Sequence, residues 1–407
     1  MTKKQDLYEK LCKSYEFMLG SLPNREQFKH ALQETLTEED IQVIFLLPLQ
    51  GEVPIARLEK KAAKIGISTE KLHAIVRRLV PEGFIASYIK TPDRGKDGMA
   101  YPAPAPLVNM RHEGRVVRRG DIISMTELQV RKHEDDSMRQ AAAVYFNAMT
   151  EDAGRSIPTQ TPYLRVLPIE ATLRENPEYG RKITVNEAIP DPREVLPIDV
   201  VSEMVKEEPI IAVAECYCRR TKQIIGEGCD HPLETCLYFN ELALLQIEAG
   251  RARQIEYEEA IHILRECEEA GLVHNVSNCE GHISSLCACC TCSCGAMKSL
   301  KFGGTNTSAR SRFVVAYDGS QCALCETCVD VCPIDAISTS GQGLKIDFDR
   351  CIGCGLCVFN CPEGSLHMVP RENPPKVYAD GRSLMRRISI EALVSLVKKK
   401  VGNLLGG

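Results

Sequence analysis

Apolar residues in the first eighty positions recur with the spacing of amphipathic helices, and a strand-like pattern follows them. Thr37-Glu38-Glu39-Asp40 has the form of a capping box, the side-chain pattern that satisfies the first amides of a helix. Ser68 is placed to cap a later helix. Three helices followed by a hairpin predict a winged-helix domain over residues 1–110. After a helical segment at 1–35, the predicted helices cover 41–47, 54–66 and 71–80, and the hairpin strands cover 84–89 and 99–101 around a turn at 92–98.

This winged helix has two interpretations. Such a domain can place its third helix in the major groove of DNA, and basic residues occupy both that helix and the predicted wing. The alternative is docking to the rest of the protein or to a partner. The net charge is -5 and acidic residues interrupt the basic positions, so docking is favoured over nucleic acid. The basic positions are Lys71, His73, Arg77, Arg78, Lys90, Arg94 and Lys96, and the acidic ones are Glu70, Glu82, Asp93 and Asp97.

The middle of the chain mixes short helices and strands. Residues 111–209 are expected to form an α/β connecting region without a catalytic pattern. Farther on, Tyr257, Ile261 and Leu264 line one face of a helix that ends at Gly271. Cys267 lies on the same face, and we expect it to be a core thiol. The other expected elements are a helix from about 124 to 149, strands at 163–169, 182–185 and 210–214, and a helix at 199–206.

Two further segments are a predicted linker and a predicted C-terminal tail. Residues 301–312 are expected to be a flexible linker, because glycine and small polar residues dominate its first part. The C-terminal tail, 373–407, contains an amphipathic stretch at 389–405 that is basic at 398–400. We expect a docking helix there, with peripheral membrane contact as the weaker alternative.

Composition limits the class of protein. With 407 residues the chain is long enough for two to four domains. No apolar window reaches the length of a membrane span or of a leader, so a cytoplasmic location is expected. Twenty cysteines would be unusual as disulfides in a reducing compartment, and nineteen of them crowd between Cys216 and Cys361. Cofactor binding explains this crowding better than packing does.

Eight cysteines form two runs of one pattern, Cys-x2-Cys-x2-Cys-x3-Cys-Pro. This is the spacing of proteins with two 4Fe–4S clusters, in which the fourth thiolate of each run reaches the other cluster. Zinc is the alternative, but zinc needs only four ligands and has no use for the third cysteine or the Cys-Pro ending of a run. The predicted ligands are Cys322, Cys325, Cys328 and Cys361 for the first cluster, and Cys351, Cys354, Cys357 and Cys332 for the second.

The two runs also belong to an internal repeat, in which residues 329–337 correspond to residues 358–366. The segment resembles the bacterial dicluster ferredoxin domain, and the resemblance implies a pseudo-symmetric βαββαβ unit. We therefore expect an α+β multidomain protein. Its predicted last domains are a cysteine-rich cluster-binding domain at 210–300 and, after the linker, a ferredoxin-like domain at 313–372.

Ten more cysteines lie between positions 216 and 294 once the core thiol is set aside, and four thiolates suffice for one cluster. One or two further 4Fe–4S clusters are expected, with a zinc site, a disulfide or a redox-active thiol pair as alternatives. In an extended segment Cys287 and Cys289 would face one side. Cys290, Cys292 and Cys294 would face the other. The candidates are Cys216, Cys218, Cys229, Cys236, Cys287, Cys289, Cys290, Cys292 and Cys294, with Cys279 as a weaker one.

The segments 214–220, 228–237 and 269–274 are similar to a family of ferredoxin-fused proteins from anaerobic bacteria and archaea. In that family the dense run reads Cys-Asn-Cys-Cys-x-Cys-Cys-Cys. Here Ala288 and Ser293 replace two of its members, which puts Cys292 and Cys294 forward as ligands. The resemblance covers about residues 160–370 and implies iron–sulfur electron transfer within multi-subunit anaerobic redox complexes.

The leading hypothesis is a non-catalytic electron-transfer subunit that relays electrons through several 4Fe–4S clusters, with flavoprotein, hydrogenase or reductase subunits as partners. The chain has neither a Gly-x-Gly-x-x-Gly motif nor a phosphate-cradling Gly-Lys-Ser or Gly-Lys-Thr. One alternative is a redox-responsive winged-helix regulator that binds DNA. Another is an oxidoreductase whose upstream cluster binds substrate at an open iron. His231, His274 and His282 are weaker ligand candidates than the cysteines.

Overall fold

The computed structural model divides into two compact units. The first contains residues 1–150, 212–233 and 240–254, and the second contains residues 151–211, 234–239 and 255–407. The structure describes residues 3–19, 25–48, 52–89, 114–118, 129–131, 135–151, 160–174, 196–281, 283–303, 307–341, 343–391 and 394.

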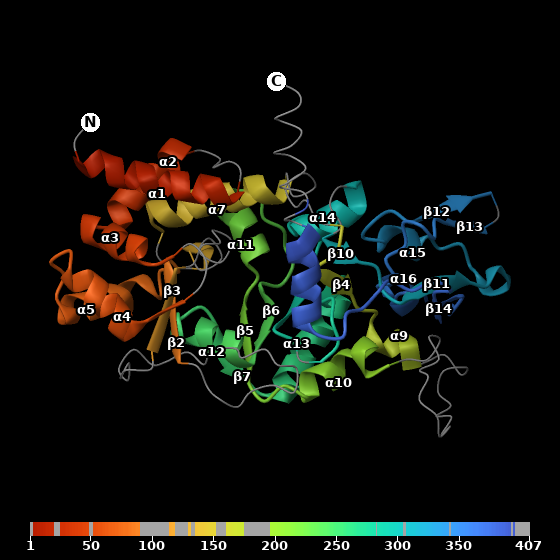
Figure 1. Cartoon of the computed structure of the whole chain (residues 1–407). Helices are drawn as coiled ribbons and strands as arrows, with labels where there is room; N and C mark the ends of the chain where they lie inside the picture. Colours follow the sequence, from red (N-terminus) through yellow and green to blue (C-terminus); the bar gives the residue numbers. More distant parts are fainter. Residues whose placement is uncertain are drawn as a thin grey trace, which may run out of the picture. The chain divides into compact units, whose positions relative to one another are not determined.

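Among its described residues, the N-terminal part of the first unit contains five helices and a small sheet (Figure 1). The predicted capping box is present: the Thr37 hydroxyl accepts a hydrogen bond from the Asp40 amide, and the Asp40 carboxylate accepts one from the Thr37 amide at 2.6 Å. The sheet has the antiparallel order β1-β3-β2. The elements are α1 (Lys3–Leu19), α2 (Arg25–Thr35), α3 (Glu38–Leu46), β1 (Glu52–Pro54), α4 (Ile55–Ala63), α5 (Thr69–Leu79), β2 (Ile85–Ile89) and β3 (Gly114–Arg118).

The three helices predicted after residue 37 and the first hairpin strand occur where the pattern placed them. The predicted turn and returning strand, 92–101, lie outside the described residues. In the structure the partner of β2 is β3, with Ile85 opposite Arg118. The winged-helix assignment stays a prediction.

One hydrophobic core joins these helices to α7 (Ser137–Glu151). Phe28 contacts Tyr15 and Tyr145, each with ring centroids 6.0 Å apart. Cys12 is fully buried in this core and is therefore a packing residue. The remaining elements of the first unit are β5 (Ile211–Glu215), α11 (Tyr217–Ile224), α12 (Asn240–Glu248) and β7 (Arg253–Ile255).

The second unit is built on strands in the order β10-β4-β8-β9-β6. All their pairings are antiparallel except that of β10 with β4. The helix predicted to end at Gly271 is α13, and Cys267 on it is 1% exposed, so its expected place in the core is confirmed. The elements are β4 (Leu164–Val166), α9 (Glu170–Arg174), a turn of 3-10 helix (Pro197–Asp199), α10 (Val201–Lys206), β6 (Glu234–Phe239), α13 (Tyr257–Glu269), β8 (Val273–Ser277), β9 (Ser285–Cys289), α14 (Gly295–Phe302) and β10 (Ser308–Ala309).

The C-terminal module of this unit, residues 313–370, has the βαββαβ order that the resemblance implies. β11 pairs with β14 and β12 pairs with β13, both antiparallel. A turn of 3-10 helix (Gly319–Gln321) follows β11. The elements are β11 (Phe313–Tyr317), α15 (Thr327–Asp330), β12 (Ile337–Ser340), β13 (Gly343–Ile346), α16 (Leu356–Phe359) and β14 (Leu366–Pro370).

The segments on either side of this module are more regular than expected. Lys301 and Phe302 still belong to α14, and Ser308 begins β10, so regular elements occupy much of the expected linker. The C-terminal helix starts near residue 381, eight residues before its predicted beginning. The carboxylate of Glu391 accepts hydrogen bonds from the amides of residues 160 and 161, which fixes this helix to the second unit. In the part of the chain that is described, every helix is too short or too polar to cross a bilayer.

A buried ion pair attaches the module to the 3-10 turn that precedes α10. Arg312, just before β11, donates to the Asp199 carboxylate, and the two side chains are only 9% and 2% exposed. Burial raises the pKa of Asp199, while the Arg312 charge acts in the opposite direction. Removing one partner of such a pair leaves an uncompensated buried charge.

We expect Arg312→Leu to lower the free energy of unfolding by about 3–5 kcal/mol. The double variant Arg312→Leu/Asp199→Leu should recover part of that loss, because the Asp199 charge is then removed, while buried Arg165 loses its acidic neighbour. Denaturant unfolding measures both effects, and Arg382→Leu, at an exposed position, serves as control. Equal destabilisation in the single and double variants would contradict a role for charge compensation.

Candidate metal centres

Three thiols of the first run and one of the second line a single cavity in the C-terminal module. Cys322 follows the 3-10 turn after β11, Cys328 lies on α15, and Cys361 follows α16. We call this site the outer cradle. Residues 323–326 on its rim are all exposed. Its four cysteines are Cys322, Cys325, Cys328 and Cys361.

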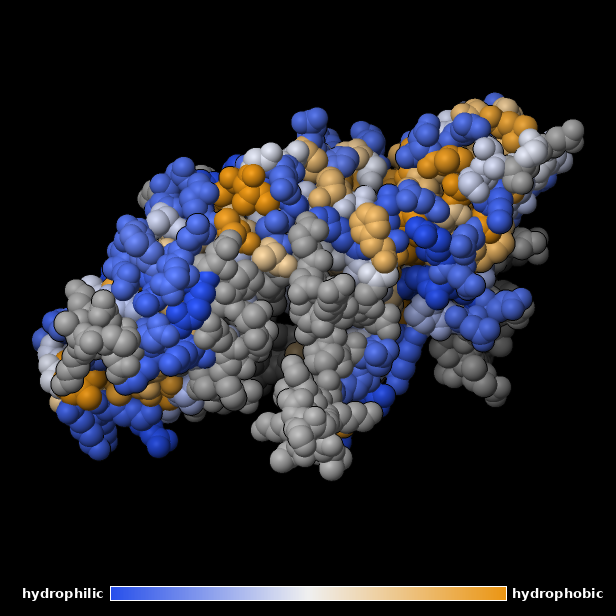
Figure 2. Space-filling view, turned by 90° about the horizontal axis from the view of Figure 1, so that it is seen from above, coloured by the Kyte–Doolittle hydropathy of each residue, from blue (hydrophilic) through white to orange (hydrophobic). Residues whose placement is uncertain are grey.

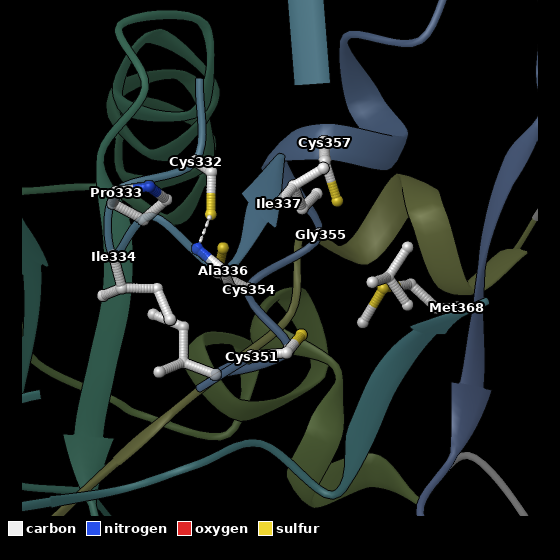
Figure 3. Close-up of a pocket in the computed structure, with 13 residues that line it drawn as sticks. Cys332, Pro333, Ile334, Ala336, Ile337, Cys351, Cys354, Gly355, Cys357 and Met368 are labelled. Atoms are coloured by element: carbon white, nitrogen blue, oxygen red, sulfur yellow. Dashed lines mark hydrogen bonds between the residues drawn. The ribbon is translucent and has the colours of Figure 1, made fainter. Parts of the chain in front are cut away.

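The complementary set lines a second cavity, the inner cradle, where the four sulfurs point towards a common space (Figure 3). Its thiols are Cys332 from the first run and Cys351, Cys354 and Cys357 from the second. Residues 351–357 are all buried. The two cradles thus divide the eight cysteines as the spacing predicts, three from one run and the fourth from the other.

The donor sets fit 4Fe–4S clusters, because each cavity offers four thiols and additional donors aimed at sulfur. In the inner cradle the Ala336 amide donates to Cys332 Sγ at 3.2 Å. In the outer cradle the Leu324 amide donates to Cys322 Sγ at 3.4 Å. Hydroxyl groups approach two more sulfurs there, Thr327 at 3.4 Å from Cys325 and Ser365 at 3.3 Å from Cys361. Such hydrogen bonds stabilise thiolates and raise the reduction potential of a bound cluster.

Burial raises the pKa of thiols in both cradles, Cys328 of the outer one included, but it acts most strongly in the inner cradle. It raises the pKa of Cys354 to about 12 and raises that of Cys357 as well. In the outer cradle, hydrogen bonds from Thr327 lower the pKa of Cys325. Metal binding to the inner thiols must displace protons that burial retains, so loading there depends on pH. Two clusters of the same type would therefore differ in environment.

The pseudo-repeat extends to the backbone. Three pairs of positions, related by an offset of 29 residues, have positive φ angles in both halves. In the first half a side chain is present at each position, whereas the second half has glycine throughout. The pairs are Leu324 with Gly353, Glu326 with Gly355, and Asp335 with Gly364.

The glycines at the inner cradle are explained by close packing. A Cβ on Gly353 would lie 2.0 Å from the backbone oxygen of Phe313, and one on Gly355 would lie 2.8 Å from Thr172 Oγ1 on α9. Leu324, the counterpart of Gly353, is 41% exposed and has room for its side chain. The inner loop is thus fitted against β11 and α9, and the outer loop faces solvent.

We expect Gly353→Ala to destabilise the chain by about 1–3 kcal/mol or more, because the new Cβ overlaps a backbone atom that cannot rotate away. Gly364→Ala is the control, since Gly364 has a positive φ of 63° but no atom within 4 Å of the added Cβ. Thermal unfolding and iron content per chain would measure the difference. An equal loss in both variants would show that φ strain, not packing, decides the effect.

The upstream cysteines of the second unit gather around β9. Cys236 on β6 lies opposite Cys287 on β9. The Cys289 thiol is in hydrogen-bonding contact with Cys287 and Cys294, and these contacts together with burial raise the pKa of Cys289. The expectation that Cys294 faces away from Cys287 and Cys289 is wrong, because the chain turns after Cys290 and does not continue extended.

The other cysteines of the dense run remain close to each other. The Sγ atoms of Cys290 and Cys292 lie within 4.8 Å. Ser293 is buried, and its hydroxyl lies 3.8 Å from Cys292 Sγ. Cys279, the weaker candidate, is also buried and forms a backbone bridge with Tyr378.

Three candidates belong to the first unit. Cys216 is the N-cap residue of α11, and Cys218 lies in the first turn of that helix. Cys229 lies in the loop that follows. The Cys216 amide donates to the Leu233 carbonyl at 2.7 Å, so this loop returns to the start of α11.

Two polar side chains, one in each unit, are buried although the sequence suggests surface or ligand roles for them. Arg219 on α11 is 1% exposed. The pKa of His231 is lowered first by its own burial and second by the Arg219 charge. His274 on β8 is also buried, with Nδ1 3.7 Å from Glu268 Oε1, and burial lowers its pKa to about 4. A neutral imidazole at this position is a core residue. His282 lies outside the described residues.

Arg371 is a residue that the motif did not reveal. It follows β14 and donates to the Cys351 carbonyl at 2.6 Å and to the Ser311 carbonyl at 3.0 Å. A cation held beside the inner cradle would offset the charge of a thiolate-bound cluster. The sequence contains no signal for Arg371, which is simply a basic residue after a predicted strand. Its contact with Cys351 depends on how β14 lies along the second cysteine loop.

Three of the four basic residues of α5 lie beside carboxylates, and the fourth, Arg77, is exposed. Lys71 pairs with Glu39, His73 Nε2 lies 2.8 Å from Glu59, and Arg78 pairs with Asp40. DNA phosphates would have to compete with these partners. Lys90, Arg94 and Lys96 lie outside the described residues. The contacts on α5 favour docking over DNA binding.

Comparison with known proteins identifies the chemistry of the C-terminal module. The family profile described as "4Fe-4S binding domain" matches residues 344–367. The chain carries a 4Fe–4S ferredoxin domain. No solved structure matches the chain.

The chain is similar to several curated proteins over part of its length. A tetrathionate reductase subunit of Archaeoglobus fulgidus is 33% identical over 114 residues, 26% of this chain and 51% of the relative. Pyruvate synthase subunit PorD of Methanocaldococcus jannaschii is 39% identical over 56 residues, 14% of this chain and 65% of the relative. One subunit of the Na(+)-translocating ferredoxin:NAD(+) oxidoreductase complex of Acetobacterium woodii is 47% identical over 45 residues, which are 11% of this chain and 14% of the relative. The chain therefore spans less than two thirds of these relatives, and the matches cover at most about a quarter of it.

Proposed function

We propose that this chain is an electron-transfer subunit of an oxidoreductase complex, in which two 4Fe–4S clusters occupy the outer and inner cradles. The arrangement of two complementary four-thiol cavities supports this proposal, because each set contains the ligand number that one cluster needs. The relatives named as subunits of a reductase, a synthase and an oxidoreductase complex point to the same role. Catalysis would then belong to another subunit, in a complex of the anaerobic kind.

The difference in exposure gives the relay a direction. A cluster in the outer cradle lies at the surface, where Leu324 and Cys325 are exposed. A cluster in the inner cradle is enclosed by residues 351–357, whose side chains are buried. In Figure 2 apolar residues reach the surface among hydrophilic ones at the right of the view, over this module. The outer cluster would exchange electrons with a partner, and the inner one would exchange them with the rest of the second unit.

Metal content tests the ligand sets. Anaerobically purified Cys322→Ala and Cys351→Ala variants should each lose about four irons and four sulfides relative to the wild type. Each should also take up one electron fewer in a reductive titration. Cys267→Ala, at a core thiol on α13, should lose neither iron nor electron uptake. A wild-type protein that contains zinc in place of iron, or clusters that do not reduce reversibly, would contradict the proposed function.

The charge of the outer rim predicts its preference among electron donors. Glu326 and Glu363 line the outer cradle and are exposed. At low ionic strength the radical cation of reduced methyl viologen should reduce the clusters about tenfold faster than the radical anion of a reduced disulfonated viologen of similar potential. This ratio should approach one in Glu326→Lys/Glu363→Lys and stay unchanged in Glu258→Lys, which alters an exposed acid on α13. Stopped-flow absorbance measures both rates, and a ratio near one in the wild type would exclude the outer rim as the port.

A further inference from the structure

A second group of four thiols lies in the same unit, on the sheet upstream of the module. Cys236 and Cys287 occupy opposite positions on the neighbouring antiparallel strands β6 and β9. Directly opposite residues place their side chains on the same face, with Cβ atoms about 4.5–5.5 Å apart. Cys289 is two residues beyond Cys287 on β9 and therefore shares that face.

The fourth thiol comes from the next element. After β9 the chain turns through residues 291–293, and the Cys294 amide donates to the Cys290 carbonyl at 3.1 Å. This turn brings Cys294 into contact with the Cys289 thiol, which Cys287 also contacts. Cys294 is the N-cap residue of α14, so the positive end of that helix lies at the thiol group. A helix N-terminus stabilises thiolates.

We propose that Cys236, Cys287, Cys289 and Cys294 bind a third 4Fe–4S cluster. Four convergent thiols are the complete ligand set of such a cluster. This inference rests on the proposed electron-transfer function, since it adds a carrier to the same relay. Cys290 and Cys292 are left outside this ligand set.

The surroundings favour a redox cluster over structural zinc. Cys289 and Cys294 belong to the hydrophobic core that also contains Cys351, Cys354 and Cys357 of the inner cradle. Structural zinc typically stabilises segments that lack a sufficient core, whereas these thiols lie on a sheet with a core of its own. A dry apolar setting shared with the inner cradle suits electron transfer between clusters.

A short hydrogen-bonded route connects this site with the inner cradle. The Ile169 amide donates to the Cys354 carbonyl at 2.9 Å, and two residues earlier the Leu167 amide donates to the His274 carbonyl at 2.9 Å. His274 lies opposite Ala288, which stands between Cys287 and Cys289 on β9. Few residues therefore separate the two sites, and the order outer, inner, upstream follows for the relay.

Metal analysis of the full chain tests this ligand set. Alanine and serine variants at each of the four cysteines should lose about four irons and four sulfides while retaining the clusters of the two cradles, seen by electron paramagnetic resonance after reduction. The serine variants nearly preserve volume, so they separate ligand loss from misfolding. Cys267→Ser, a buried thiol on α13, should retain all the iron.

Two results would overturn the inference. Full iron content in any one of the four alanine variants, which offer no replacement ligand, would exclude that cysteine and the proposed set. Loss of about one zinc in place of iron would show a structural metal site. Neither result depends on electron transfer by the two cradles, so failure here is distinguishable from failure of the proposed function.

Discussion

The close packing of the second cysteine loop against the rest of its unit is the constraint on which the iron–sulfur region depends. Gly353 fits against the Phe313 carbonyl and Gly355 against Thr172, and a side chain at either position would force the loop away. The Cys354 carbonyl also accepts the Ile169 amide. Because the loop carries three of the four inner thiols, the position of a whole cluster is set by these backbone contacts.

The same constraint breaks the symmetry of the repeat. Both halves have the same cysteine spacing and positive φ angles at corresponding positions, but in the second half Gly353 and Gly355 pack closely against Phe313 of β11 and Thr172 of α9. One cradle consequently faces solvent and the other faces the core. Since burial, charge and hydrogen bonds to sulfur set cluster potentials, identical motifs can yield two carriers with different roles.

The sequence was most informative where chemistry imposes spacing. The Cys-x2-Cys-x2-Cys-x3-Cys-Pro runs predicted which thiols share a cavity, and the capping residues predicted α3 and α5. The predicted orientation of Cys294 was wrong, because alternation of side chains assumes an extended chain. The dense cysteine run turns after β9. Local pattern could not indicate the pair Arg312–Asp199 either, because its members lie 113 residues apart and neither belongs to a periodic pattern. Such contacts depend on tertiary packing.

Arg312 and Arg371 show how the fold places positive charge near a site rich in thiolates. Both flank the module, one before β11 and one after β14, and the Arg371 amide donates to the Arg312 carbonyl at 2.8 Å. Arg312 is neutralised by Asp199, whereas Arg371 is directed at the Cys351 carbonyl. One arginine therefore attaches the module, and the other is placed to act on the inner cradle. Because a nearby cation favours the more negative, reduced state of a cluster, Arg371 would raise the potential of the inner carrier and draw electrons from the surface inward.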